Sequence, residues 1–276
     1  MKTILVINDN SLEAEYAAKF ALLLAQKICA DIILANSQSE TRKIIEKAVA
    51  GHIQKDTSTE KADHNLQNNL SIISKLSFGF KPVIKEVDIS EFCESSLATL
   101  IYKNQIWAVV KGTGKAELST WKKRNLNIDD VLRKINCPLL LIPYSWSKKK
   151  IERITYIADL RYCRFEVVRF IAELAKSWDA DMSIAHICAS GLPPMDIDYA
   201  QMVFADEICS NISYPRIFFN HIKETNLETV VDIIINVMHN DMLVLVNHNC
   251  HFERIMGQKL TDVMPDHISI PLLVFP

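Results

Sequence analysis

Two aspartates stand at matching positions in two related stretches of the chain. Residues 3–37 and 153–187 align without a gap, and Asp9 and Asp159 each follow a short apolar run. Ligands of open parallel sheets bind beyond the carboxyl ends of the strands, where such a carboxylate can contact the nucleoside part of a ligand. An aspartate at this place can instead form an Asx turn that caps the following helix. The residue type and its position fit both interpretations.

The segment from Lys111 to Leu126 offers a second kind of chemistry. It contains Gly112 and Gly114, and five cations lie in or beside it: Lys111, Lys115, Lys122, Lys123 and Arg124. Small residues allow a backbone to approach a phosphate closely, and N–H groups at the start of the next helix can hold it. Cationic side chains can also bind an anion as point charges. The alternative interpretation is a charged surface loop without a ligand.

Histidine and cysteine side chains gather late in the chain. His248, Cys250 and His251 follow a strand-like apolar run, and His239 precedes it. A zinc site requires about four ligands in tetrahedral geometry, which residues 248 and 250 could begin to supply. Adjacent side chains at 250 and 251 usually point apart, so the alternative is a loop that binds no metal.

The sequence contains no recognisable catalytic motif. It holds no Gly-x-Ser-x-Gly turn, no Walker loop and no helical pair of metal ligands. Cys163 lies between Arg161 and Arg164, which could lower the pKa of its thiol, and a partly buried inert thiol is the alternative. We therefore expect no catalytic residues and a protein that is not an enzyme.

The composition is typical of a soluble globular protein. The chain has 276 residues, of which 49% are hydrophobic and 23% charged, and this length predicts roughly two domains. A net charge of −2 gives no reason to expect binding to nucleic acid or to a membrane surface. The N-terminal apolar run is too short for a signal peptide, and none reaches the about 18 residues of a membrane helix. Seven scattered cysteines indicate reduced thiols, so we expect a cytoplasmic protein.

Each of the two related stretches has the pattern of a strand, a helix and a second strand. In the first copy, 4–7 is a short apolar run, Ser11 can cap the helix that follows, and apolar residues then recur at helical spacing to Ile28. A second apolar run at 32–35 completes a βαβ unit. Because the second copy repeats this order, the sequence predicts a duplicated α/β unit.

Further strands and helices are expected along both halves. Strands are expected at 81–87, 106–110, 138–142, 182–188, 216–222, 242–246 and 271–275. Helices are expected at 41–53, 62–76, 90–103, 128–135, 199–211, 226–239 and from about 257. This alternation predicts two doubly wound, Rossmann-like domains, 1–145 and 151–276, each with a five-stranded parallel sheet. The similar segments PLLLIP and PLLVFP that end the two halves could pair with each other and hide two sheet edges.

The pattern resembles the tandem two-domain form of the universal stress protein family. The resemblance rests on the opening KTILVINDNSLEAEYAAKFALLLAQKICADIILA, on the aspartate after the first strand of each copy, and on Cys137-Pro138 before the last strand of the first domain. It implies the strand order 3-2-1-4-5, a role in stress adaptation, and last strands that pair as in a dimer. Some members of the family bind ATP and others do not.

The ATP-binding members carry a loop of the form Gly-x2-Gly-x9-Gly-Ser/Thr after the fourth strand. Counted back from the last strand of the first domain, its positions fall on Gly112, Lys115, Asn125 and Leu126, with Gly114 as an additional glycine. This loop departs from the pattern, so the resemblance implies a degenerate site.

The corresponding loop of the second half, 247–258, is shorter than that of the family. Its candidate positions are Asn247, Gly257 and Gln258, of which only Gly257 keeps a motif glycine. For both halves we expect degenerate nucleotide sites and no cofactor, with ATP as the alternative.

Three functions are therefore considered. The first is a non-enzymatic regulatory or interaction protein of stress adaptation, with a protein partner, with its two halves paired like a dimer, and with further homodimerisation open. The second is a nucleotide-binding sensor that uses Asp9, Gly112, Gly114 and Lys115. The third and weakest is a metal-binding protein that uses the loop 248–251.

Overall fold

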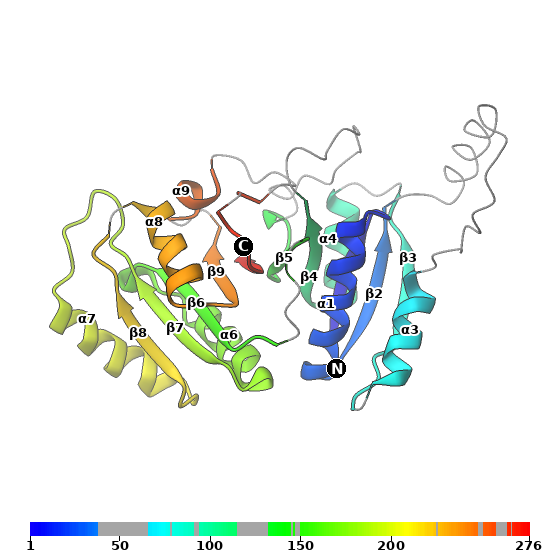
Figure 1. Ribbon diagram of the computed structural model, residues 1–276, viewed down its shortest axis with the longest axis horizontal. Helices are drawn as coiled ribbons and strands as arrows, with labels where there is room; N and C mark the ends of the chain where they lie inside the picture. The colour runs from blue at the N-terminus through cyan, green and yellow to red at the C-terminus, as the bar shows by residue number, and fades with distance from the viewer. Residues whose placement is uncertain are drawn as a thin grey trace.

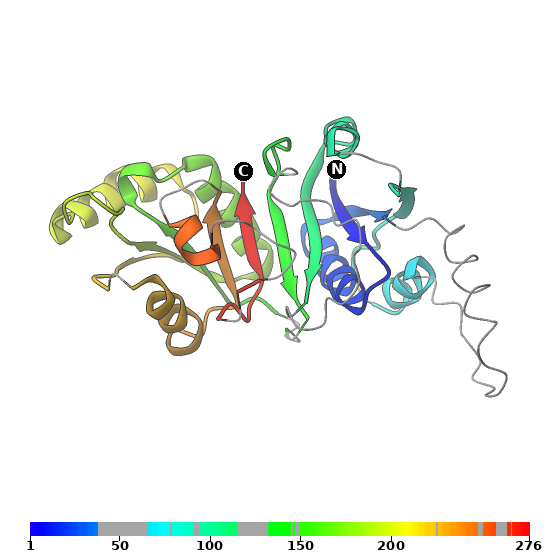
Figure 2. The ribbon, with the colours of Figure 1, turned by 90° about the horizontal axis from the view of Figure 1, so that it is seen from above.

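The computed structural model describes residues 1–37, 66–77, 79–90, 94–114, 132–144, 146, 150–224, 226–247, 251–257, 264–265 and 267–276. Two α/β halves lie side by side in an elongated molecule (Figure 1). Helices lie on both sides of the sheet (Figure 2). Among the helices that the structure describes, none is both long and apolar enough to cross a lipid bilayer.

Five parallel strands form the sheet of the first half. Along the chain they are β1 (Lys2–Asn8), β2 (Ala30–Asn36), β3 (Ile84–Asp88), β4 (Ile106–Thr113) and β5 (Leu139–Pro143). In space they lie in the order β3-β2-β1-β4-β5, the 3-2-1-4-5 order that the family resemblance implied. The helices described in this half are α1 (Leu12–Ile28), α3 (Leu66–Leu76) and α4 (Glu94–Lys103).

The second half repeats this topology. Its strands are β6 (Arg153–Ala158), β7 (Asp181–His186), β8 (Ile217–His221), β9 (Met242–Val246) and β10 (Leu272–Phe275), in the spatial order β10-β9-β6-β7-β8. Its α-helices are α6 (Phe165–Trp178), α7 (Ile197–Val203), α8 (Leu227–Asp232) and α9 (Phe252–Met256). The predicted α/β class with two doubly wound units is confirmed.

The two five-stranded sheets join into one ten-stranded sheet. β5 and β10 run antiparallel, with Leu140 opposite Leu273 in the centre of the pairing. Figure 2 shows these two strands side by side, with their arrowheads pointing in opposite directions. The segments PLLLIP and PLLVFP thus pair with each other, as their similarity suggested. We predicted one five-stranded sheet for each half, and this pairing makes the two sheets continuous.

Helix α1 shows how the sequence positions each βαβ unit. The Oγ of Ser11 accepts a hydrogen bond from the Ala14 N–H at 3.1 Å, as predicted for an N-cap. The apolar stripe then buries residues such as Phe20 and Leu24, each of which contributes about 1.5–3 kcal/mol on burial. The helix ends at Cys29, whose φ of 54° is left-handed, and Asp179 ends α6 in the same way.

Aromatic side chains pack the two halves together beside the β5–β10 pairing. The rings of Trp107 and Phe170 are stacked, with centroids 4.2 Å apart, and Phe170 meets Phe275 edge to face at 5.2 Å. The Lys2 ammonium lies 4.9 Å from the centroid of the Trp107 ring and forms an ion pair with Glu173 at 2.7 Å. The contact between the halves therefore extends from the backbone pairing into a side-chain seam.

Strand β4 is longer than predicted. We expected it to end at residue 110, but it continues to Thr113, and Gly112 pairs with Ile142 of β5. The reason is that β5 itself extends to Pro143 and offers partners to these residues. Gly112 is therefore a strand residue rather than the first residue of a loop.

The loop predicted at 247–258 contains a short helix, α9, which ends before Gly257. The helix expected to start near Gly257 falls mostly on 258–263, outside the described residues, and stays a prediction. Phe252, Ile255 and Met256 are apolar at helical spacing and are buried, so one helical turn places all three against the core. Gly257 follows with a positive φ of 86°.

Other differences from the prediction are small. β3 begins at Ile84 rather than at 81, because Pro82 has no N–H group for the ladder. The helices predicted at 199–211 and 226–239 continue beyond α7 and α8 as π-helical turns over Phe204–Ile208 and Ile233–Val237. The helix predicted at 41–53, and the first half of that at 128–135, lie outside the described residues.

Replacing Phe170 by alanine should lower the free energy of unfolding by about 2–3 kcal/mol, because the variant loses both ring contacts in the seam. Phe165→Ala on the same helix is the matched control. Its side chain is 38% exposed, so the loss should be below about 1 kcal/mol. Urea unfolding compares the two variants, and equal losses would contradict a stabilising role of the seam.

Candidate functional site

The carboxyl ends of β1 and β4 mark the switch point of the first half, which is the place where a ligand would bind. β1 lies between β2 and β4, so the strand order reverses at this point, where doubly wound folds bind their ligands. Asp9 directly follows β1 and Gly114 directly follows β4, and Ile7 of β1 is the register partner of Lys111. The structure thus brings the predicted site residues Asp9, Gly112 and Gly114 to the same edge of the sheet.

Asp9 forms the local turn that was the alternative to ligand binding. Its Oδ1 accepts hydrogen bonds from the backbone N–H of Ser11 at 3.0 Å and from the Ser11 hydroxyl. These bonds fix the side chain that caps α1, so Asp9 supports the helix start. Contact between Asp9 and a nucleoside stays a prediction.

The two glycines of the first half pack against Glu13 in the first turn of α1. A Cβ atom on Gly112 would lie 2.1 Å from the Glu13 carbonyl oxygen, so only glycine allows this approach of strand and helix. A Cβ atom on Gly114 would lie 2.7 Å from Oε1 of the Glu13 side chain. A carboxylate therefore lies against the backbone directly after β4. Glu13 was not among the predicted site residues, although acidic residues at a helix start are easily recognised.

Several predicted site residues lie outside the described part of the chain. These are Lys115, Asn125, Gln258, His248 and Cys250. Their proposed roles in binding a phosphate or a metal stay predictions.

Asp159 has a different environment from Asp9. Its side chain is fully buried, and Oδ1 accepts hydrogen bonds from the backbone N–H and the Nε of Arg161 at 3.1 and 2.8 Å. Oδ2 accepts from Nη2 of Arg161 at 2.6 Å and from the Ala189 N–H at 2.8 Å. Burial alone would raise the pKa of this carboxyl group, but the bonds from Arg161 and Ala189 outweigh it and hold the pKa below its ordinary value. Asp159 is therefore a charged residue whose two oxygens are both engaged within the protein.

His186 lies beside Asp159 at the end of β7. It is fully buried, and its Nδ1 accepts a hydrogen bond from the Leu160 N–H at 3.2 Å. Its Nε2 lies 3.7 Å from the Sγ of Cys188, and the ring of His221 is centred 5.3 Å away. Burial lowers the pKa of His186, while the charge of Asp159 acts in the opposite direction. The sequence offered one signal for this residue, a polar side chain at the carboxyl end of a buried strand.

The remaining candidates of the second half lie around the same crevice. Asn247 follows β9 and is buried, and Gly257 is exposed and ends α9. His251, at the start of α9, is also buried, and its Nε2 donates to the Ile187 carbonyl at 2.9 Å. Within the described ranges, no group of three or more His, Cys, Asp or Glu side chains is arranged to hold a metal ion.

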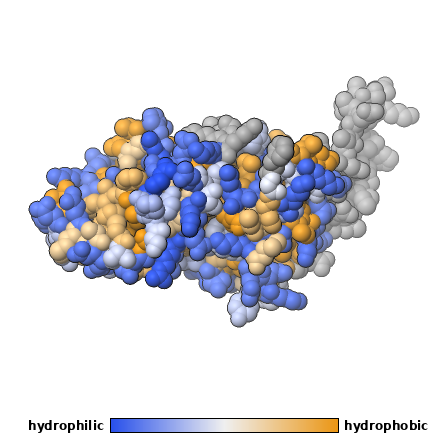
Figure 3. Space-filling model, turned by 90° about the horizontal axis from the view of Figure 1, so that it is seen from below, coloured by the Kyte–Doolittle hydropathy of each residue, from blue (hydrophilic) through white to orange (hydrophobic). Residues whose placement is uncertain are grey.

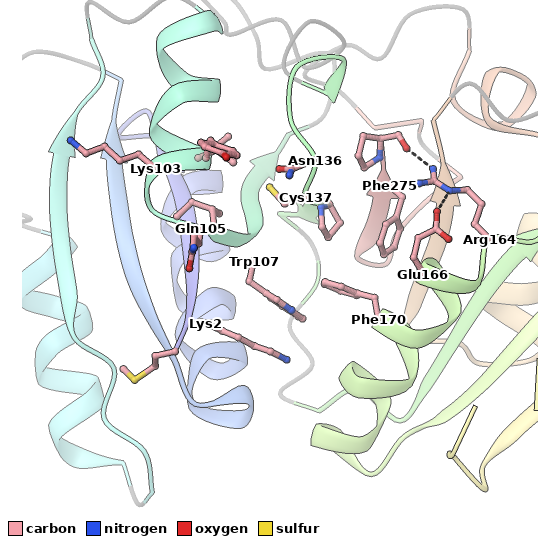
Figure 4. A pocket seen from close by; sticks show the side chains of 16 residues that line it. Lys2, Lys103, Gln105, Trp107, Asn136, Cys137, Arg164, Glu166, Phe170 and Phe275 are labelled. Carbon is pink, nitrogen blue, oxygen red and sulfur yellow. Dashed lines mark hydrogen bonds and ion pairs between the residues drawn. The ribbon is translucent and has the colours of Figure 1, made fainter. Parts of the chain in front are cut away.

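A groove of about 900 Å³ lies between the halves, where the amino ends of β4 and β5 meet the carboxyl end of β10. Figure 4 shows Trp107 and Phe170 facing each other, with Arg164 and Glu166 on the side of the second half. Arg164 donates to the Glu166 carboxylate and to the Pro276 carbonyl, both at 2.7 Å. This groove lies at the opposite edge of the sheet from the first-half crevice, and the aromatic seam lines it.

Gly112→Ala should lower the free energy of unfolding by at least about 1–3 kcal/mol, because the added methyl group would meet the backbone of α1. In Gly114→Ala the methyl group meets the flexible Glu13 side chain, which can rotate away, so the loss should be smaller. Urea midpoints of the two variants test this order, and the reverse order would refute the packing role of Gly112.

Stability should fall as the pH drops below about 6.5, because His186 is held with a lowered pKa. The unfolded chain then binds a proton that the folded chain excludes, and a protonated Nδ1 cannot accept from Leu160. His186→Asn keeps a hydrogen-bond acceptor but cannot titrate. The melting temperature of this variant should therefore decline less than that of wild type between about pH 7 and pH 5, a window that contains the ordinary histidine pKa. His239→Asn, at an exposed position with positive φ, is the control. Parallel pH profiles for wild type and His186→Asn would contradict this assignment.

No protein-family model matches the sequence, and no curated protein sequence matches it. Solved structures match the fold over nearly the full length. A universal stress protein from Archaeoglobus fulgidus DSM 4304 is similar with a TM-score of 0.54 at 11% identity, covering 99% of this chain and 97% of that one. A protein from Pseudomonas aeruginosa UCBPP-PA14, described as a universal stress protein, gives 0.51 at 13% identity, covering 100% and 93%.

A protein of unknown function from Pseudomonas aeruginosa PAO1 is similar with a TM-score of 0.52 at 13% identity, covering 100% of this chain and 92% of that one. At such low identity the likeness concerns the fold and not the chemistry of the site. The resemblance seen in the sequence is thereby confirmed at the level of architecture, and the chain has the fold of the universal stress proteins.

Proposed function

We propose that this chain is a tandem universal stress protein that acts in stress adaptation without catalysis, as a regulatory or interaction module of the cytoplasm whose nucleotide crevices no longer bind ATP. The observation that carries the proposal is that protein carboxylates occupy both switch-point crevices. Glu13 lies against Gly114 in the first half, and Asp159 forms an ion pair with Arg161 in the second.

In the first crevice, electrostatics oppose a triphosphate. The start of a helix and a glycine-containing strand end would otherwise suit a phosphate group. Here the Glu13 carboxylate lies close to the backbone of Gly114, and two like charges a few ångströms apart repel. The cations of this region that the sequence offered lie mostly between 115 and 124, outside the described residues.

In the second crevice, the candidate groups are engaged by the protein itself. Asp159 accepts four hydrogen bonds from Arg161 and Ala189, and His251 donates to Ile187. These contacts leave the carboxylate turned toward its own chain, which supports the loss of nucleotide binding on this side.

The titratable groups near the crevices do not suggest catalysis. Burial raises the pKa of the Cys163 thiol to about 12, so this thiol is held in its protonated, unreactive form despite the nearby arginines. This supports a function in binding or regulation rather than covalent chemistry.

Exposed apolar side chains support a protein partner. Ile72, Ile73 and Leu76 are exposed on α3, next to the edge strand β3, and Tyr199 and Met202 are exposed on α7, near the other edge. Figure 3 shows hydrophobic patches interrupting the hydrophilic surface over both halves. The β5–β10 pairing already satisfies the strands that would join two chains in a dimer, so the proposed association uses other surfaces.

A nucleotide sensor that uses the first half is the second candidate. One observation favours it: Asp9 is only half-buried at the carboxyl end of β1, whereas the side chain of Asp159 is fully buried. In this case Asp9, Gly112, Gly114 and Lys115 would contact the ligand.

Isothermal titration calorimetry with ATP, ADP and AMP tests the proposal. Wild type should show no saturable heat up to about 1 mM nucleotide, a limit that corresponds to about −4 kcal/mol of binding free energy. Glu13→Gln removes the opposing charge and should bind ATP more tightly than wild type, whereas Glu15→Gln, which only breaks the ion pair with Lys19, should not.

Saturable binding by wild type that is lost in Asp9→Ala would overturn the proposal in favour of the sensor. Stoichiometric zinc in the same preparation, measured by elemental analysis, would instead favour the loop 248–251 as a metal site.

A further inference from the structure

Residues 187–195, here called the strap, connect β7 to α7 and lie at the carboxyl edge of the second half. A turn inside the strap is closed by a hydrogen bond from the Leu192 N–H to the Ala189 carbonyl at 3.1 Å, with Gly191 at a φ of 82°. Its tip, from Ser190 to Pro194, is exposed, while Ile187 and Ala189 are buried. The strap is therefore an ordered loop with a buried stem.

One set of tethers reaches the strap from the segment that follows β6. The buried Asp159 carboxylate accepts the Ala189 N–H at 2.8 Å. Arg161 holds that carboxylate with Nε and Nη2 and donates through Nη1 to the Pro193 carbonyl at 3.2 Å. A single guanidinium thus links both the stem and the tip of the strap to the end of β6, with charge-assisted bonds that are stronger than neutral ones.

A second set of tethers comes from α9, which follows β9. His251 donates through Nε2 to the Ile187 carbonyl at 2.9 Å, and Arg254 donates through Nη1 to the Ser190 hydroxyl at 2.8 Å. β6 and β9 are adjacent strands, and the point between them is the topological switch point of this half. The strap is therefore hydrogen-bonded to residues that follow both strands of the switch point.

The first copy uses the matching aspartate differently. Asp9 accepts hydrogen bonds from Ser11, two residues further along the chain. Asp159 accepts one from Ala189, thirty residues away. The position of Arg161 corresponds to Ser11 in the first copy, which has no guanidinium to offer. The tethering is thus a property of the second half and not of the duplicated unit.

We propose that residues 187–195 are a built-in strap that covers the topological switch point of the second half, and that Arg161 is the latch that keeps it in place. Release of the latch opens the strap locally and uncovers Asp159, while the sheet beneath stays folded. This goes beyond the proposed function, because it adds a local conformational change of the second half that requires no nucleotide.

Amide hydrogen exchange on the full chain, without any nucleotide, tests the latch. In Arg161→Gln the Ala189 amide and its neighbours in the strap should exchange at least about tenfold faster than in wild type, because local opening becomes less costly. Amides within β6, such as that of Ile157, should keep their protection. Arg161→Lys, which keeps the charge but not the forked geometry, should lie between the two.

Arg164→Gln is the matched control, since this arginine lies three residues further on and bonds to Glu166 and Pro276 instead. An unchanged rate at Ala189 in Arg161→Gln, or equal acceleration in the strap and in β6, would overturn the proposal. If Arg161→Gln does not fold, Arg254→Gln releases the outer tether to Ser190 and should accelerate strap exchange by a smaller factor. No acceleration there would overturn the proposal as well. Because no nucleotide is present, this result is independent of the calorimetry.

Discussion

The antiparallel pairing of β5 with β10 joins the two halves into one sheet and sets how they meet. Each half alone would present the last strand of its sheet as an open edge, with unpaired backbone groups that invite association. Here Leu140 and Leu273 face each other in the centre of one ten-stranded sheet, and all residues of both strands are buried. The pairing therefore covers, within one chain, a sheet edge that each half would otherwise expose.

This pairing also fixes where the side chains of the two halves meet. With β5 and β10 antiparallel, the amino ends of β4 and β5 lie next to the carboxyl end of β10. Trp107 consequently reaches Phe170 of α6, and Lys2 reaches Glu173. The carboxyl edges of the two halves point in opposite directions, so the two ligand crevices are separated and can evolve independently.

The crevices have in fact diverged, although they began from one pattern. Asp9 and Asp159 occupy equivalent positions, yet Asp9 holds the Ser11 cap of α1 and Asp159 is buried beneath Arg161. In the first half a carboxylate from α1 lies against Gly114, and in the second a loop is fastened across the switch point. Buried polar groups need hydrogen-bond partners, and the two halves supply them from different elements of the chain.

The duplicated α/β architecture and the Ser11 cap could be predicted from the amino-acid sequence, because hydrophobic periodicity and helix capping are local signals. The similarity of PLLLIP to PLLVFP suggested their pairing. The roles of the polar residues depend on the three-dimensional arrangement. It placed Gly112 inside a strand against Glu13, turned the loop after β9 into a helix that buries Phe252, and brought Ala189 to Asp159. Those contacts join residues far apart in the chain, and the hydrogen bonds that a buried carboxylate finds depend on which elements surround it rather than on its own sequence neighbourhood.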